Sequence, residues 1–72
     1  SWGDADCNGK VEINDVVLVM SYVSNKTANV ITQDGLVNAD VNANGDGISS
    51  MDALAIQRYL ANIISELPES YL

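Results

Sequence analysis

The sequence predicts an all-α fold built from two repeats, each a short polar loop followed by a helix. In both loops, at residues 4–15 and 40–52, Asp and Asn alternate around a glycine. Apolar residues at three- and four-residue spacing follow each loop, which is the pattern of an amphipathic helix. Asp15 and Asp52 lie 37 positions apart, so the two copies share one register. A polar linker separates them.

The chain is expected to form one small domain held together by a bound metal. Its 72 residues are near the size at which a hydrophobic core alone gives marginal stability. Cys7 is the single cysteine and histidine is absent, which excludes an intrachain disulfide and a Cys/His zinc site. The expected parts are repeat one at 4–24, a linker at 25–38, repeat two at 40–64 and a tail at 65–72.

The first loop has the ligand spacing of a calcium-binding EF-hand loop, in which oxygen donors on alternate residues surround one cation. An acidic turn that caps a helix is the simpler interpretation, but it does not explain the fixed offsets around the glycine. The predicted ligands are the side chains of Asp4, Asp6, Asn8 and Asp15 at positions 1, 3, 5 and 12, the backbone carbonyl of Lys10, and Glu12 directly or through water; Gly9 makes the turn.

The second loop repeats this pattern with one extra residue. Its twelfth residue is Met51, whose thioether is a poor ligand for a hard cation, so we expect a 13-residue loop that Asp52 closes. Gly47 is expected to absorb the insertion. The predicted ligands are Asp40, Asn42, Asn44 and Asp52, together with either the Asp46 carboxylate or a backbone carbonyl. With Asn replacing Asp, the second site is expected to be the weaker one.

Two helices are expected after the loops, and a short one in the linker. The first runs to about Ser24; its many valines make a strand the alternative, but the loop geometry favours a helix. The second is expected from about Ser50 to Ile64, with Ser49 or Ser50 as N-cap. Its expected buried residues are Leu54, Ile56, Tyr59, Leu60, Ile63 and Ile64. In the linker, Thr32 would cap a helical turn that buries Leu36 and Val37.

Charge and composition exclude several functions. A net charge of -7 argues against nucleic acid and anionic membranes as partners, and no apolar run is long enough to span a membrane. Two bound Ca²⁺ would reduce the charge to -3, and the mutual repulsion of the carboxylates predicts that folding depends on metal. The acidic residues are committed to metal and no nucleophile-base pair is present, so the chain is not expected to be an enzyme.

Two calcium loops, each followed by one helix, resemble a dockerin domain. Three sequence features carry the same resemblance: the opening segment Trp2-Gly3-Asp4-Ala5-Asp6, the closing residues Asp15 and Asp52, and the segment Gln57-Arg58-Tyr59-Leu60. The resemblance covers residue 2 to about residue 64. It implies a pseudo-twofold fold with two Ca²⁺ and a non-catalytic adaptor that binds a cohesin domain of a scaffoldin. It also implies an extracellular place in a bacterial cellulosome, as a module appended to a polysaccharide-degrading enzyme or a scaffold protein.

The resemblance also implies which residues contact the cohesin. They are Ile13, Asn14, Met20 and Ser21 in the first repeat and Ser50, Met51, Gln57 and Arg58 in the second. Because the two sets differ, we expect binding in one orientation. Ile13, Val16, Val17 and Met20 would form an apolar partner surface, or else belong to the core; the sequence leaves both interpretations open.

The resemblance further suggests that the chain ends are clasped by a stack of Trp2 on Pro68, with Tyr71 as an alternative aromatic. Cys7, at loop position 4, is expected to face solvent as a variable position. A calcium sensor and a calcium-stapled structural spacer are the competing functions. A sensor stays folded without metal, whereas a dockerin is expected to lose most of its structure.

Overall fold

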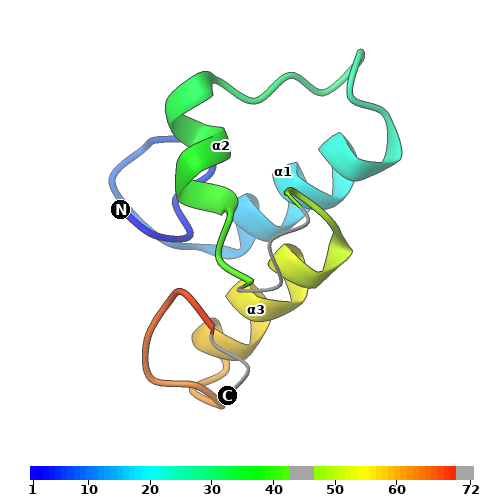
Figure 1. The fold of residues 1–72 in the computed structure, drawn as a ribbon. Helices are drawn as coiled ribbons and strands as arrows, with labels where there is room; N and C mark the ends of the chain where they lie inside the picture. The colour runs from blue at the N-terminus through cyan, green and yellow to red at the C-terminus, as the bar shows by residue number, and fades with distance from the viewer. Residues whose placement is uncertain (43–46, 70–72) are drawn as a thin grey trace.

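A computed structural model of the chain describes residues 1–42 and 47–69. It contains three helices, α1 (Ile13–Ser24), α2 (Gln33–Ala39) and α3 (Ser50–Leu60), and no named strand within those two ranges (Figure 1). One isolated bridge pairs Asn42 with Glu69. The predicted all-α class is therefore confirmed, including the short helix in the linker.

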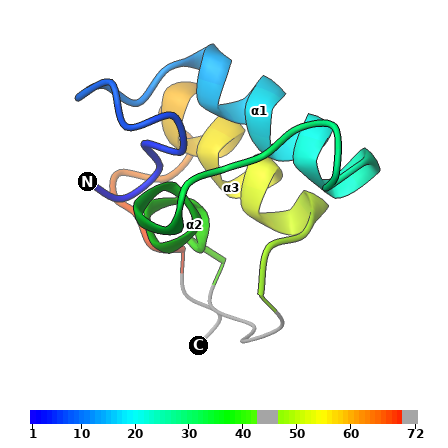
Figure 2. The same ribbon diagram turned by 90° about the horizontal axis from the view of Figure 1, so that it is seen from above.

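The core lies between α1 and α3, which run antiparallel side by side, while α2 crosses them at one end (Figure 2). Val19 of α1 and Ile56 of α3 are fully buried there. Burial of each such side chain stabilises the fold by about 1.5–3 kcal/mol. Val16 and Ala53 complete the contact between the helices, with Val41 from the second loop packed against it.

The apolar residues of α1 lie on two different faces. Val16 belongs to the core, whereas Ile13, Val17 and Met20 are 59%, 57% and 47% exposed. Successive exposed residues are four and three positions apart, so they form one stripe along the helix. The sequence left open whether these residues belong to the core or to the surface. Val16 belongs to the core, and Ile13, Val17 and Met20 lie on the surface.

Helix α3 ends at Leu60, so the predicted extension to Ile64 is wrong. Asn62 adopts a left-handed backbone with φ of 61°. The N–H of Asn62 donates to the Tyr59 carbonyl at 3.1 Å, and that of Ile63 donates to the Arg58 carbonyl at 2.9 Å. These two bonds form a Schellman motif, which satisfies the last carbonyls and turns the chain away. Ile63 is consequently exposed, and Ile64 is only half-buried.

The N-cap predicted for the linker helix is confirmed, because the Thr32 hydroxyl accepts the N–H of Gly35 at 3.1 Å. The prediction that Val37 is buried is wrong: it is 55% exposed, and Leu36 is half-buried. Ile31, Gly35 and Ala39 are the buried residues of this segment instead. At the start of α3, Ser49 is the N-cap and its hydroxyl accepts the N–H of Met51 at 3.2 Å.

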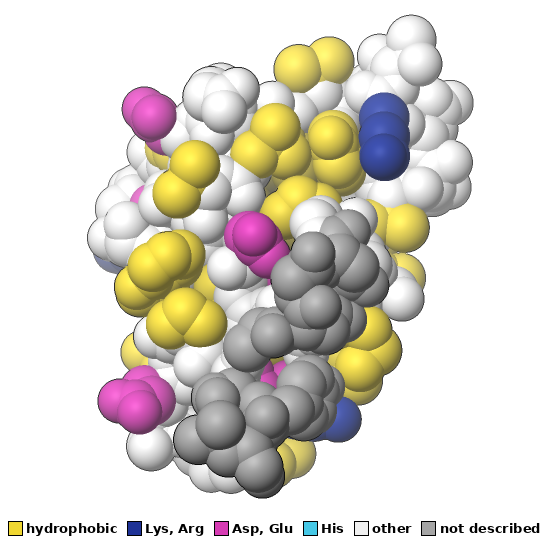
Figure 3. All heavy atoms as spheres, in the orientation of Figure 1, with side chains coloured by type: hydrophobic (Ala, Val, Ile, Leu, Met, Phe, Trp, Pro, Cys, Tyr) yellow, Lys and Arg dark blue, Asp and Glu magenta, His cyan; other side chains and the backbone are white. Residues whose placement is uncertain are grey.

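On the face drawn in Figure 3, apolar and acidic side chains are interspersed, and the few basic ones lie toward the edges of the view. This distribution agrees with the negative net charge of -7. None of the helices in the described ranges has the length and hydropathy needed to cross a lipid bilayer.

Candidate calcium loops and partner surface

The first loop winds around the carboxylate of Asp4. This carboxylate accepts the backbone N–H of Asn8 at 3.2 Å and that of Gly9 at 2.9 Å. Gly9 has φ of 90°, a conformation that side chains with a Cβ rarely adopt. The loop is closed from the other side by Asp15, which accepts the N–H groups of Asp6 at 3.2 Å and Glu12 at 2.7 Å. Hydrogen bonds from backbone N–H groups to these two carboxylates thus hold the two ends of the loop together.

Three of the predicted ligands come together. One carboxylate oxygen from each of Asp4, Asp6 and Asp15 lies within 4.8 Å of the others. Asp4 and Asp15 are buried, at 3% and 0% exposure. Among residues 1–42 and 47–69, the salt bridge found joins Arg58 to Glu69, so it brings no cation to this cluster. Buried carboxylates that lack a cationic partner are costly unless they hold a metal, so these residues fit a calcium ion.

The electrostatics of Asp6 agree with a cation site. The residue is exposed as a whole, but its carboxyl loses part of its hydration within the loop, which is the main reason its pKa is raised. The charge of Asp15 and the hydrogen bond with Asp4 raise the pKa further, and the N–H of Asn8 lowers it. A divalent cation between these carboxylates removes the repulsion among them.

The other predicted ligands of the first loop lie beside this cluster. The Asn8 side chain donates to Glu12 Oε1 at 3.0 Å and accepts the N–H of Lys10 at 3.0 Å. Lys10 is exposed and Glu12 is half-buried. Cys7 is exposed as predicted, and its sulfur lies 3.8 Å from the Thr32 hydroxyl at the start of α2.

Helix α2 supports the first loop, a role that the sequence analysis missed. Asn38 Nδ2 donates to the backbone carbonyl of Asp4 at 3.0 Å, and the Asn38 carbonyl accepts the N–H of Gly3 at 2.6 Å. Gly35 faces the carbonyl of Ala5 so closely that an added Cβ would collide with it. The linker helix is therefore fastened to the calcium loop. The sequence signal for this close approach is the glycine, Gly35, within a helical pattern.

The second loop ends on Asp52 in the way that the first ends on Asp15. Asp52 is fully buried, and its Oδ1 accepts the N–H groups of Val41 at 3.0 Å and Asn42 at 2.9 Å. Its Oδ2 accepts the N–H of Ser49 at 2.8 Å. The side chain of Met51 has no such role, and the geometry agrees with a loop of 13 residues.

Of the remaining predicted ligands of the second loop, Asp40 and Asn42 are among the described residues. Asn44 and Asp46 lie outside the described residues. Asp40 is exposed at the end of α2, and Asn42 is buried at 2% exposure. Gly47 has φ of 80°, as Gly9 has 90° in the loop without an insertion, so its predicted role in absorbing the extra residue stays a prediction.

The C-terminal tail returns to the second loop, a contact that the sequence did not predict. The N–H of Glu69 donates to the Val41 carbonyl at 2.6 Å. Its carboxylate accepts Asn42 Nδ2 at 3.3 Å and pairs with Arg58 Nη1 at 2.8 Å. Glu69 thus links the tail, the loop and α3. A lone Glu after Pro68 carries no sequence signal for such a contact.

The predicted cohesin contacts differ between the two repeats. Ile13, Val17 and Met20 form the exposed apolar stripe on α1. Helix α3 exposes no large hydrophobic side chain, and its Arg58 is engaged by Glu69. Of the others, Asn14, Ser50 and Gln57 are exposed, and Ser21 and Met51 are half-buried.

The two terminal segments come close to each other at Gly3 and Leu67. A Cβ built on Gly3 would lie 2.8 Å from Leu67 Cδ1, so these residues touch. Trp2 is half-exposed and Pro68 is exposed. The clasp of Trp2 on Pro68 stays a prediction, and Tyr71 lies outside the described residues.

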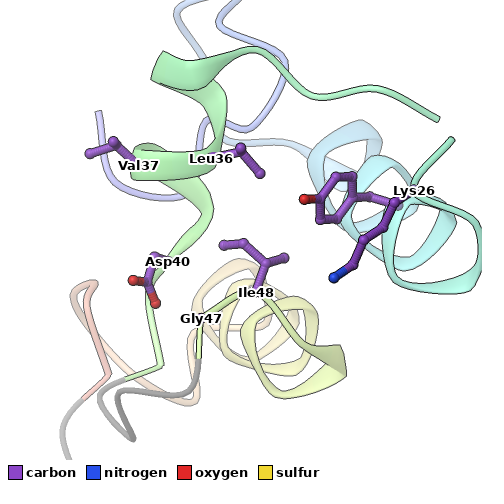
Figure 4. A pocket seen from close by; sticks show the side chains of 7 residues that line it. Lys26, Leu36, Val37, Asp40, Gly47 and Ile48 are labelled. Atoms are coloured by element: carbon purple, nitrogen blue, oxygen red, sulfur yellow. The ribbon is translucent and has the colours of Figure 1, made fainter.

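A cavity of about 370 Å³ lies between α2 on one side and, on the other, the C-terminal end of α1 and the residues just before α3. Figure 4 shows Leu36 and Ile48 pointing into it, whereas Val37 points away. Its polar side chains are Tyr22, Lys26 and Asp40. These residues do not form a nucleophile-base pair, and the cavity gives no indication of catalysis.

Comparison with known families identifies the fold. The family model for the dockerin type I domain matches residues 2–61. The chain belongs to the dockerin type I family. A xylanase/β-glucanase of Ruminococcus flavefaciens contains a segment 43% identical over 79 residues, which covers 99% of this chain but 10% of that protein. The dockerin thus spans about a tenth of this relative's length, and the similarity is confined to the non-catalytic module.

Solved structures give the same assignment. A chain from the complex of the third ScaB cohesin of R. flavefaciens with a group 1 dockerin has a TM-score of 0.85 and 47% identity, covering 92% of this dockerin and 94% of that chain. A chain from a ScaC cohesin–ScaB dockerin complex of Acetivibrio cellulolyticus has a TM-score of 0.79 and 40% identity, covering 93% of this dockerin and 90% of that chain. A chain from the Coh-OlpC–Doc435 complex of Clostridium thermocellum has a TM-score of 0.77 and 34% identity, covering 97% of this dockerin and 99% of that chain. Dockerins bind calcium in general, in agreement with the acidic cluster.

Proposed function

We propose that this dockerin is a calcium-dependent adaptor that binds a cohesin domain and so attaches a larger protein to a scaffold. The observation that carries the proposal is the stripe of Ile13, Val17 and Met20 on α1. Exposed apolar side chains aligned on one helix are unusual unless a partner covers them, and they provide the central contacts of many interfaces. The related dockerin structures, which come from cohesin complexes, indicate the partner.

Binding in a single orientation follows from the difference between the two repeats. The positions on α3 equivalent to Ile13 and Met20 are Ser50 and Gln57, which are polar. Arg58 is held at 2.8 Å by Glu69 and is half-buried. The α1 stripe is therefore the better cohesin surface, and a half-turn of the module would present a surface of different chemistry.

Two Ca²⁺ are proposed as the cofactors, one in each loop. Asp4, Asp6, Asn8, Glu12 and Asp15, with the Lys10 carbonyl, would hold the first. Asp40, Asn42 and Asp52, together with Asn44 and Asp46, would hold the second. The bound cations neutralise the carboxylates, and the loops then hold α1 and α3 in place for the partner.

The parent protein is proposed to be an extracellular polysaccharide-degrading enzyme or a scaffold subunit of a cellulosome. The support is the 43% identity to a segment of a xylanase/β-glucanase. In this arrangement the dockerin contributes attachment, and catalysis belongs to other parts of the parent protein.

The proposal is tested by isothermal titration with the third ScaB cohesin of R. flavefaciens in calcium buffer. Val17→Asp buries a charge in the proposed interface and is expected to weaken binding by about 2 kcal/mol or more, roughly 30-fold. Val30→Asp is the matched control, because Val30 is 76% exposed and lies outside α1. Gln57→Asp on α3 is expected to have little effect. Affinity that stays intact in Val17→Asp and in Gln57→Asp alone, but is lost when the two changes are combined, would contradict the single orientation.

A further inference from the structure

We propose that Glu69 is a positioning residue for the second calcium site, which orients the side-chain amide of Asn42 toward the metal. The inference rests on the proposed calcium site in the second loop. It assigns a role in cation binding to the C-terminal tail, which lies outside both loops. The contact that carries it joins Asn42 Nδ2 to Glu69 Oε1 at 3.3 Å.

The argument starts from the chemistry of an amide side chain. Asn presents an oxygen acceptor at one end and an NH₂ donor at the other, and only the oxygen can bind a cation. An ionised carboxylate accepts hydrogen bonds and donates none. Glu69 therefore selects the orientation in which Asn42 gives its NH₂ to the tail and keeps its oxygen for the loop. Outer partners orient the ligands of metal sites in this way.

The first loop carries a different group at the position of Asn42. The residue equivalent to Asn42 is Asp6, whose two carboxylate oxygens are chemically alike. Rotating an Asp carboxylate by half a turn changes nothing for the cation, whereas the same rotation of an Asn presents a donor to it. The replacement of Asp by Asn in the second loop thus creates a requirement for an acceptor outside the loop, and Glu69 meets it.

Glu69 is itself held in place from two sides. Arg58 Nη1 donates to Glu69 Oε2 at 2.8 Å and to Oε1 at 3.0 Å. The N–H of Glu69 donates to the carbonyl of Val41, the residue that precedes Asn42. The Glu69 side chain is only 10% exposed. The carboxylate is consequently fixed and adjacent to the amide that it orients.

The test is a site-resolved calcium titration by NMR of the whole 72-residue chain. The amide signal of Ser49, whose N–H donates to Asp52, reports the second loop. The amide signal of Gly9, whose N–H donates to Asp4, reports the first loop and serves as an internal control. Glu69→Gln is expected to weaken calcium binding at the second loop about tenfold and to leave the first unchanged. Glu66→Gln, an exposed change in the same tail, is expected to alter neither.

A second background separates orientation of the amide from simple fastening of the tail. In Asn42→Asp, residue 42 is a carboxylate that needs no orienting partner, and Glu69 becomes a like charge beside it. Adding Glu69→Gln is then expected to leave affinity unchanged or to raise it. The same tenfold loss in both backgrounds would overturn the inference, as would an unchanged affinity in the single variant. Failure of the unmodified chain to bind a second Ca²⁺ would overturn both this inference and the two-ion proposal.

Discussion

Asp15 and Asp52 occupy equivalent places at the third residue of α1 and α3, and each ties its helix to the start of its loop. Asp15 accepts the N–H groups of Asp6 and Glu12, and Asp52 accepts those of the equivalent residues, Asn42 and Ser49. Both aspartates are fully buried. The two repeats therefore share one closing device although their loops differ by one residue in length.

This equivalence predicts the effects of substitutions at the end of the second loop. Asp52→Asn removes a negative charge and one acceptor from a group that receives three N–H donors. We expect calcium binding at the second loop to weaken by about 1.5–3 kcal/mol, the usual size of a hydrogen bond to a charged group. Met51→Leu should preserve it, because the closing ligand is residue 52. Calcium titration calorimetry of both variants distinguishes them, and a larger loss for Met51→Leu would contradict the 13-residue loop.

Asn38 is predicted to stabilise the first loop from α2. Asn38→Ala leaves the carbonyl of Asp4 without the Nδ2 donor at 3.0 Å, so the free energy of unfolding in calcium should fall by about 1–3 kcal/mol. Gln33→Ala, an exposed change in the same helix, is the control and should have little effect. Urea denaturation measures both. If Asn38→Ala were as stable as the control, α2 would not support the loop.

Acidification is predicted to release calcium from the first loop. Desolvation and the charge of the neighbouring Asp15 raise the pKa of Asp6, so protons compete with Ca²⁺ at a higher pH than for an ordinary Asp of pKa about 4. Affinity should therefore be full near neutral pH and decline as pH falls toward the raised pKa. Calcium titrations at a series of pH values follow this decline. Asp34→Asn, outside the loops, should leave the profile unchanged, and a profile that begins to decline only below pH 4 would contradict the account.

Much of the fold follows from the sequence because its signals are local. The loop spacing and the caps at Thr32 and Ser49 determine where the helices begin. The end of α3 was mispredicted because Ile63 and Ile64 continue the apolar spacing, whereas the left-handed Asn62 stops the helix. A stop of this kind depends on the backbone conformation of one residue.

The contacts between distant segments could not be predicted from the sequence. Asn38 on Asp4 and Glu69 on Asn42 join residues 34 and 27 positions apart. A polar residue in a linker or tail looks the same whether it faces solvent or supports a loop. The division of the α1 residues between core and surface likewise depended on where α3 packs, which periodicity alone does not give.

The central claim is that this dockerin binds a cohesin only when its loops hold calcium. The most direct measurement is a calorimetric titration with the third ScaB cohesin of R. flavefaciens, run once with excess Ca²⁺ and once with a chelator, with circular dichroism in both buffers. The account predicts one-to-one binding in calcium, and loss of both binding and helical structure in chelator. Equal binding in the two buffers, or a calcium-stabilised fold that binds no cohesin of a broader panel, would contradict it.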